Sequence, residues 1–338
     1  MIEHPFIEII ELIKKARSKA FSSVNTELIN LYWHIGEYIH KRLENSEWGE
    51  KKVNELADFI KSYYPELKGF NRRSLYRMKQ FYETYFLSEI VSSMMTQKES
   101  RDIRQSLLTK ISWTHHLTLI SRTKTEEERE FYLRLCVEEN YTVRELDRQI
   151  NNLVFERTLI GNSKLPLTIK ESHPNILNNF KDPYIFEFLN LQEPYDEKDV
   201  KKGLIQQMKK FILELGKDFL FIGEEYRVQV GNRDFYIDLL FYHRGLQCLI
   251  AFELKNDKFE PEHLGKLNFY LEALDRDVKK QNENPSIGIL LCKDKDSEVV
   301  EYALSRSLSP TLVSEYTMQL PDKKLLQQKL HEIFSTGK

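Results

Sequence analysis

Apolar residues recur every three or four positions through most of the first 160 residues, which is the period of an amphipathic helix. Two later helices begin with the spacing of a capping box, Thr125 with Glu128 and Thr142 with Glu145. The pattern therefore predicts an all-helical N-terminal domain over residues 1–160. The clearest apolar series are Ile7, Ile10 and Ile13, then Leu28, Leu31, Ile35 and Ile39, and then Val53, Leu56, Phe59 and Ile60.

The period of the pattern changes after residues 161–197, which collect prolines, asparagines and short apolar pieces typical of a connection between domains. An apolar-faced helix then runs from Val200 to Leu215. Three stretches that follow, "YRVQV", "DFYIDLLFY" and "LQCLIAFELK", predict strands joined by short turns. A second helix, around residues 264–274, precedes the fully apolar "SIGILLC", which we expect in the middle of a sheet. Residues 198–338 therefore predict an α/β domain with a mixed sheet flanked by helices.

Composition narrows the class of protein. The chain of 338 residues is 41% hydrophobic and 30% charged, which is typical of a soluble globular protein. Its formal net charge of −2 means that binding to a polyanion must depend on local basic patches or on a metal ion. Cys136, Cys248 and Cys292 are far apart and odd in number, which favours reduced core residues over a zinc site. With no apolar run long enough to span a membrane, we expect a cytoplasmic protein.

Three charged residues lie inside the predicted strands: Asp238, Glu253 and Lys255. Side chains alternate faces along a strand, so Glu253 and Lys255 share one face. A two-residue turn at Gly245 and Leu246 would put Asp238 directly opposite Glu253, and a four-residue turn would put it one diagonal step away. A three-residue turn would send the two carboxylates to opposite faces. The first two registers therefore bring both carboxylates onto one face.

Two neighbouring carboxylates repel each other, and in an apolar setting one takes up a proton unless a cation lies between them. A divalent ion would satisfy the pair, and oxygen ligands suit Mg²⁺, with Mn²⁺ as a substitute, better than zinc. Lys255 could then orient a water molecule or stabilise the charge that builds on a phosphate. A metal ion held by two carboxylates, with a lysine beside it, can hydrolyse a phosphodiester bond. The bland alternative is a salt bridge between Asp238 and Lys255 on a non-catalytic sheet.

These residues carry a resemblance to a known family. "ID" followed after fourteen residues by "ELK", within the order helix, three strands, helix, strand, resembles the PD-(D/E)xK nuclease superfamily. The longer stretches "DFYIDLLFYHRGLQCLIAFELKNDKFEPEHLGKLNFYLEALD" and "NPSIGILLCKDKD" resemble the YhcG family of bacterial proteins, in which a helical N-terminal domain precedes such a nuclease-like domain. "GFNRRSLYRMKQFY" is similar to that N-terminal domain.

The resemblance implies a restriction-endonuclease-like fold and a set of site residues. Asp238 and Glu253 would be metal ligands, the carbonyl of Leu254 would add a ligand, and Lys255 would be the catalytic lysine. Many superfamily members also carry a glutamate on the first core helix, for which the candidate here is Glu214. On the second core helix, where related nucleases often carry glutamine, this chain offers Lys266, Asn268 and Tyr270 to meet a phosphate or a base.

A basic helix in the first half is a candidate DNA-binding element. In "GFNRRSLYRMKQFYETY", Asn71 can cap a helix whose packed side contains Leu75, Met78 and Tyr82. Its exposed side would carry Arg72, Arg73, Arg77 and Lys79. These residues could reach phosphates or guanine edges, as in a winged-helix or helix-turn-helix domain, or they could form an ordinary solvated face. A further alternative for the N-terminal domain is a dimer contact.

The expected function is a metal-dependent DNA endonuclease that acts in defence against foreign DNA or in DNA processing. One alternative is a non-catalytic DNA-binding or regulatory protein on a degenerate nuclease fold, because a fold does not fix an activity. Another is a subunit of a restriction-type complex with a partner protein. DNA is the expected partner, a homodimer is one expected assembly, and no membrane association is expected.

Overall fold

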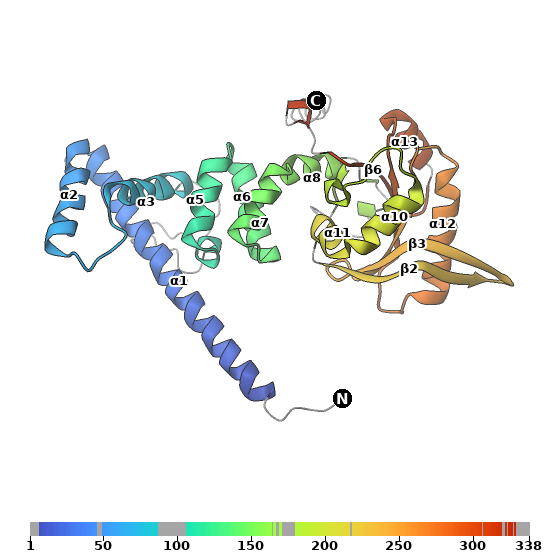
Figure 1. Cartoon of the computed structure of the whole chain (residues 1–338), viewed down its shortest axis with the longest axis horizontal. Coiled ribbons are helices and arrows are strands. Elements are labelled where there is room, and N and C mark those ends of the chain that lie inside the picture. Colours follow the sequence, from blue (N-terminus) through green and yellow to red (C-terminus); the bar gives the residue numbers. More distant parts are fainter. Residues whose placement is uncertain are drawn as a thin grey trace. The chain divides into compact units, whose positions relative to one another are not determined.

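The computed structural model describes residues 7–45, 49–86, 106–163, 165–166, 169–170, 180–216, 218–305, 307–319, 322, 324–326 and 328 (Figure 1). The chain divides into two compact units, Met1–Ile150 and Asn151–Lys338, and each is considered by itself. The expected connection at 161–197 lies partly outside the described residues. Within the described part of the chain, no helix is both long and apolar enough to cross a membrane.

The N-terminal unit is helical, as the apolar period predicts. Both expected caps form, because the side chains of Thr125 and Thr142 each accept a hydrogen bond of 3.2 Å, from the backbone N–H groups of Glu128 and Glu145. The described elements are α1 (Ile7–Glu44), α2 (Glu50–Tyr63), α3 (Arg72–Tyr85), η1 (Leu107–Lys110), α5 (Trp113–Arg122), α6 (Glu126–Glu139) and α7 (Val143–Asn151).

The core of this unit forms where the second half of α1 crosses α3. Trp33 of α1 is fully buried and packs edge-on against Phe81 and Tyr82 of α3. A Cβ atom at Gly36 would lie 2.2 Å from the carbonyl oxygen of Met78, so only glycine permits this close approach of the two helices. The first half of α1 lies beyond this contact and extends past the neighbouring helices of the unit (Figure 1).

The C-terminal unit is built around one mixed sheet of six strands in the order β1-β6-β5-β4-β3-β2. β1, β6, β5 and β4 run parallel, while β3 is antiparallel to β4 and β2. The strands are β1 (Tyr184–Ile185), β2 (Phe219–Val230), β3 (Arg233–His243), β4 (Cys248–Leu254), β5 (Ile287–Cys292) and β6 (Thr311–Thr317). The helices are α8 (Val154–Ser163), η2 (Glu187–Leu189), α10 (Glu197–Gln206), α11 (Met208–Leu215), α12 (His263–Ala273), η3 (Leu274–Val278) and α13 (Ser297–Leu304).

Apolar clusters cover both faces of the sheet. Phe211 and Leu215 of α11 pack with Phe252 of β4 in one cluster, while Leu267 of α12 packs with Ala251 in the other. The expected mixed sheet between helices is confirmed, and β5 lies in the middle with every residue buried. Other details differ from the prediction: the chain forms two helices, α10 and α11, in place of one, β2 begins seven residues before "YRVQV", and β1 and β6 were not foreseen.

Candidate active site

The hairpin of β3 and β4 decides how the two candidate carboxylates meet. The paired residues run from His243 opposite Cys248 to Leu239 opposite Phe252. Continued by one residue, this register puts Asp238 directly opposite Glu253. Residues 244–247 lie between the partners of the last pair, His243 and Cys248. The register is nevertheless that of a two-residue turn, because one further pair in the same register would leave only Gly245 and Leu246 between the strands. The backbone N–H of Leu254, the last residue of β4, donates to Oδ2 of Asp238 at 3.0 Å and holds that carboxylate beside the end of β4.

Glu253 is fully buried at this point of the sheet. Its Oε1 accepts from the ammonium group of Lys266 on α12 at 2.6 Å and lies 3.3 Å from that of Lys255. Its Oε2 has no hydrogen-bond partner among the described residues. Burial, and then the nearby Asp238 carboxylate, raise the pKa of Glu253, and the two lysines offset only some of this effect. Glu253 is therefore a buried acid whose charge is incompletely matched.

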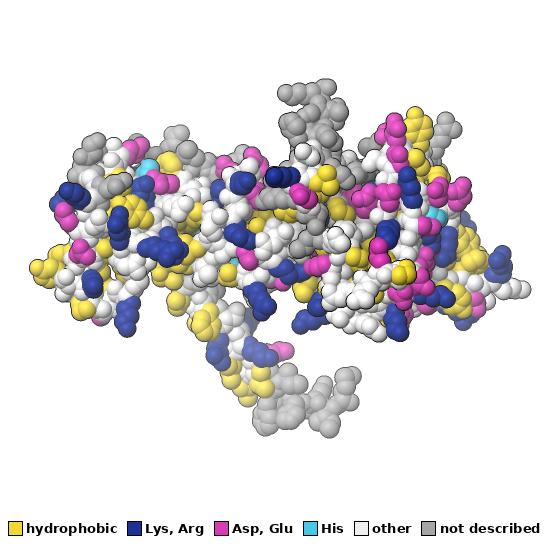
Figure 2. Space-filling view, turned by 45° about the horizontal axis from the view of Figure 1, so that its top comes forward, with side chains coloured by type: hydrophobic (Ala, Val, Ile, Leu, Met, Phe, Trp, Pro, Cys, Tyr) yellow, Lys and Arg dark blue, Asp and Glu magenta, His cyan; other side chains and the backbone are white. Residues whose placement is uncertain are grey.

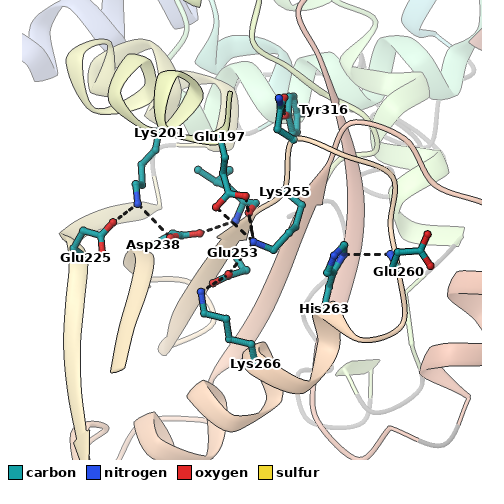
Figure 3. A network of polar contacts seen from close by, with 12 residues as sticks. Glu197, Lys201, Glu225, Asp238, Glu253, Lys255, Glu260, His263, Lys266 and Tyr316 are labelled. Atoms are coloured by element: carbon teal, nitrogen blue, oxygen red, sulfur yellow. Dashed lines mark hydrogen bonds and ion pairs between the residues drawn. The ribbon is translucent and has the colours of Figure 1, made fainter. Parts of the chain in front are cut away.

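Asp238 is also buried, and a lysine from α10, which precedes β2, contacts it. Lys201 of α10 lies 3.4 Å from Oδ1 of Asp238 and also bonds the carboxylate of Glu225 on β2 (Figure 3). The side chain of Glu225 is half exposed, and through Lys201 it belongs to the polar network of the site.

Lys255 lies between three oxygen-bearing groups. Its ammonium group is 3.2 Å from Oε2 of Glu197, the first residue of α10, and 2.9 Å from the carbonyl oxygen of Leu254 (Figure 3). Burial lowers the pKa of Lys255, but the carboxylates of Glu253 and Glu197 outweigh that effect and raise the pKa above its usual value. Lys255 is therefore a protonated cation and not a base. The sequence pattern did not identify Glu197 as a residue of the site.

Glu214 lies elsewhere, which corrects its expected place beside the other site residues. It is a fully buried residue of α11, whose apolar side packs in the cluster that contains Phe252. Its Oε1 lies 2.5 Å from Arg157 of α8 and accepts a 3.0 Å hydrogen bond from the N–H of Ile185. Glu214 thus has a cation and a backbone donor of its own, and it shares no contact with Asp238 or Glu253.

The donor set fits a hard divalent cation. Asp238, Glu253 and the Leu254 carbonyl supply oxygen atoms only, and Oε2 of Glu253 is buried without a partner among the described residues. Lysine ammonium groups now contact both carboxylates and the carbonyl. In the described ranges of the chain, no group of three or more His, Cys, Asp or Glu side chains could hold a metal ion. A metal ion would therefore be coordinated by two carboxylates and one carbonyl oxygen, and it would compete for these oxygens with the ammonium groups of the lysines.

The predicted DNA-binding residues of α3 lie in the N-terminal unit. Asn71 caps the helix as expected, accepting from the N–H of Ser74 at 3.0 Å. Arg72 and Arg73 are exposed, whereas Arg77 and Lys79 are half-buried. Lys79 pairs with Glu83 at 2.6 Å and Arg72 lies over the ring of Tyr76. The remaining basic candidate, Lys266, lies in the C-terminal unit, at Glu253.

Comparisons with known proteins cover both units. Residues 177–331 match the family model described as "YhcG PDDEXK nuclease domain", and residues 8–157 match the "DUF1016 N-terminal domain". The Escherichia coli (strain K12) protein named "Putative nuclease YhcG" is 33% identical over 347 residues, which cover 95% of this chain and 92% of that protein.

Among solved structures, a repair endonuclease from Pyrococcus abyssi matches 38% of this chain and 50% of its own, with 17% identity and a TM-score of 0.27. The structure of EndoMS in its apo form matches 39% of this chain and 49% of its own, with 17% identity and a TM-score of 0.25. The chain thus aligns with about half the length of each of these structures.

Proposed function

This chain belongs to the YhcG family and carries its PD-(D/E)xK nuclease domain, and on that premise we propose that it is a metal-dependent endonuclease that hydrolyses phosphodiester bonds of DNA. One observation carries the proposal: Asp238 and Glu253 meet across two strands, and a buried oxygen of Glu253 has no partner among the described residues. A buried carboxylate oxygen without a donor is costly, and a bound cation is one way to satisfy it.

Asp238, Glu253 and the carbonyl of Leu254 would hold Mg²⁺, with Mn²⁺ as a substitute. When bound, such an ion neutralises charge on the phosphate and lowers the pKa of a coordinated water. Lys255 would stabilise the negative charge that develops on the phosphate, because its ammonium group is protonated and lies 3.3 Å from Glu253. Glu197 would be a positioning residue that holds Lys255 in place from α10.

Two further lysines frame the site and suit contacts to DNA phosphates. Lys266 reaches Glu253 from α12, and Lys201 reaches Asp238 from α10 (Figure 3). Each ammonium group that a metal displaces from a carboxylate would be free to meet the phosphate backbone, where Lys acts as a point charge. Lys266 was expected to contact DNA from the sequence, and Lys201 is added here by its position.

The basic residues of α3 would supply a second contact to DNA. Arg72 and Arg73 are exposed and open to a ligand, whereas Lys79 is already paired with Glu83. Contacts to phosphates would add affinity without sequence preference, and contacts to guanine edges would add specificity. We propose that Arg72, Arg73 and Arg77 contribute more than Lys79 does.

The testing experiment incubates supercoiled, linear and branched DNA with the purified chain in Mg²⁺, Mn²⁺ or a chelator. The natural chain is compared with Asp238→Ala, Lys255→Ala and two matched controls, Asp234→Ala on the exposed end of β3 and Lys209→Ala on α11. We expect metal-dependent cutting that only the first two substitutions abolish. Ca²⁺ titration by calorimetry gives a second readout, in which Asp238→Ala weakens binding and Lys255→Ala does not.

Cutting that survives Asp238→Ala would overturn the assignment of the site. No cutting, no Ca²⁺ binding and retained DNA binding would favour the non-catalytic DNA-binding protein. Ca²⁺ binding without cutting would favour a subunit that needs a partner of the restriction type. A place in defence or in DNA processing, and a cytoplasmic location, stay predictions from the sequence.

A further inference from the structure

Three acidic residues form a row across neighbouring strands of the C-terminal sheet. The register of the pairs between β2 and β3 puts Glu225 directly opposite Asp238. On the other side of Asp238 lies Glu253 of β4. The metal site described above uses Asp238 and Glu253 and leaves Glu225 without a role.

The ammonium group of Lys201 lies between Glu225 and Asp238 (Figure 3). It bonds the carboxylate of Glu225 and is 3.4 Å from Oδ1 of Asp238. This is the oxygen of Asp238 that remains for a cation, because Oδ2 accepts from the backbone N–H of Leu254. The side chain of Asp238 is 8% exposed and that of Glu225 is 52% exposed. A metal ion at Asp238 would therefore compete with Lys201 for the inner carboxylate and leave the outer one to the lysine.

The backbone of Glu225 sets it apart from an ordinary surface ion pair. In the view of Figure 2, Lys and Arg side chains lie among Asp and Glu side chains on the C-terminal unit, and exposed pairs of this kind contribute little. Glu225, however, has a φ of 46° inside β2, in the left-handed region that disfavours residues with a Cβ atom. Such a conformation often accompanies a functional role. Glycine would suit this backbone better, but it would give Lys201 no second carboxylate.

We propose that Glu225 is a positioning residue, which takes the ammonium group of Lys201 from Asp238 when a metal ion binds and so keeps Lys201 beside the site to contact a phosphate of the DNA. This role rests on the metal site and the DNA substrate of the proposed function. Lys201 loses a partner when Asp238 becomes a ligand, and Glu225 holds the ammonium group where a substrate phosphate arrives. Without Glu225, the ammonium group would have Asp238 as its remaining acidic partner and would oppose binding of the ion.

Ca²⁺ titration of the full chain by calorimetry tests this exchange without cleavage. Lys201→Met removes the competing ammonium group and should strengthen Ca²⁺ binding by about tenfold. Glu225→Gln leaves the ammonium group to Asp238 and should weaken Ca²⁺ binding by about tenfold. Added to Lys201→Met, Glu225→Gln should weaken binding by about twofold at most, because no ammonium group remains to compete. The controls Glu224→Gln and Lys202→Met, at exposed neighbours on β2 and α10, should have little effect.

Two further measurements separate this role from a purely structural one. Glu225→Gly should unfold at no lower temperature than Glu225→Gln, because glycine suits the left-handed backbone, and the two variants should share the same weakened Ca²⁺ affinity. Fluorescence anisotropy in Ca²⁺ should show that Lys201→Met binds DNA about fivefold more weakly, although it binds Ca²⁺ more tightly. Natural Ca²⁺ affinity in Glu225→Gly would overturn the proposal, because the backbone and not the carboxylate would then matter.

The remaining outcomes separate this proposal from the metal site on which it rests. Equal losses of Ca²⁺ affinity from Glu225→Gln with and without Lys201 would overturn it, because Glu225 would then attract the ion directly. If Asp238→Ala weakens Ca²⁺ binding while Lys201→Met and Glu225→Gln leave it unchanged, the exchange is wrong and the metal site stands. If Asp238→Ala leaves Ca²⁺ binding unchanged, or the natural chain binds no Ca²⁺, the metal site is wrong and the exchange with it.

Discussion

Glu214 and Glu253 are both buried in the C-terminal unit, but their surroundings shift their pKa values in opposite directions. Burial alone would raise the pKa of Glu214, but the charges of Arg157 and Lys181 and the hydrogen bonds lower it below its usual value. Burial and Asp238 raise the pKa of Glu253, although lysines lie close by. Arg157 is fully buried with Glu214, whereas Lys266 is about half exposed.

The difference distinguishes a buried charge that the protein itself stabilises from one that it stabilises only in part. A buried carboxylate with a buried cation and a backbone donor has all it needs from the protein, and its removal leaves a charge unpaired. A buried carboxylate that lies beside a second carboxylate and has one oxygen without a partner is fully stabilised only when a cation binds to it. We therefore expect Glu214 to stabilise the fold and Glu253 to act in the proposed chemistry.

The largest expected effect is on activity, through Glu253→Gln. The amide keeps the volume of the side chain but removes the charge, so cleavage should fall by about 10³-fold or more. The free energy of unfolding should not fall, because the change relieves repulsion with Asp238. Initial cleavage rates in Mg²⁺ and thermal unfolding without metal provide the two measurements. A variant that unfolds at much lower temperature while cutting normally would reverse the assignment.

The reverse pattern is expected for Glu214→Ala. This change leaves the Arg157 guanidinium buried without its carboxylate and should lower the free energy of unfolding by about 3–5 kcal/mol. Denaturant unfolding would measure the loss. Ca²⁺ affinity of the folded fraction should stay that of the natural chain, because Glu214 shares no contact with Asp238 or Glu253. If Glu214→Ala lost Ca²⁺ affinity while its free energy of unfolding stayed unchanged, Glu214 would be a residue of the metal site.

His116 extends the comparison to a buried base that forms no ion pair among the described residues. Burial lowers its pKa to about 4, and its Nε2 lies 2.8 Å from the carbonyl oxygen of Leu108. Because the folded pKa lies below the unfolded value near 6.5, its contribution to stability is complete above that value and is lost as the pH falls toward 4. The loss should be on the order of 3 kcal/mol.

Comparison with His116→Gln isolates this effect from the titration of carboxylates. Glutamine can still donate to Leu108 but takes up no proton, so the stability advantage of the natural chain should shrink between about pH 6.5 and pH 4. Unfolding by denaturant at several pH values gives both curves. Parallel curves over this range would show that His116 does not couple folding to protons.

Glu197 should have a moderate effect that separates two roles at the same place. If it positions Lys255, Glu197→Ala should lower kcat by about tenfold and leave Ca²⁺ affinity unchanged. Loss of Ca²⁺ affinity in calorimetry would instead make Glu197 a metal ligand. Glu193→Ala, which removes an exposed partner of Lys293 nearby in sequence, serves as the control and should change neither quantity.

Local patterns predicted the elements of this fold that depend on neighbours in sequence. The alternation of β3 and β4 gave Asp238 opposite Glu253 as one of three registers that depend on turn length, and the structure has that register. The break between α10 and α11 was hidden because the apolar series of the two helices run on through Gln207. β1 has two residues and leaves no periodic signal.

The site residues that were missed or misplaced depend on contacts far apart in sequence. Glu197 opens a helix, where an acidic residue is ordinary because it suits the helix dipole, so nothing local marked its approach to Lys255. Glu214 was assigned to the site from the family resemblance, by its place on the first core helix. Its partner Arg157 lies on α8, 57 residues earlier, and only the folded chain brings them together.

The smallest expected effects belong to α3, where the effect of each basic side chain on DNA binding depends on whether an acidic residue already pairs with it. Arg73→Ala should weaken DNA binding evenly across sequences and reduce the salt slope by about one unit if the residue contacts a phosphate. Lys79→Ala should change the slope less, because Glu83 already holds the ammonium group at 2.6 Å. Fluorescence anisotropy in Ca²⁺ at several salt concentrations measures both slopes. Equal slopes for both variants and the natural chain would make this helix a solvated face and leave DNA binding to the lysines around Glu253.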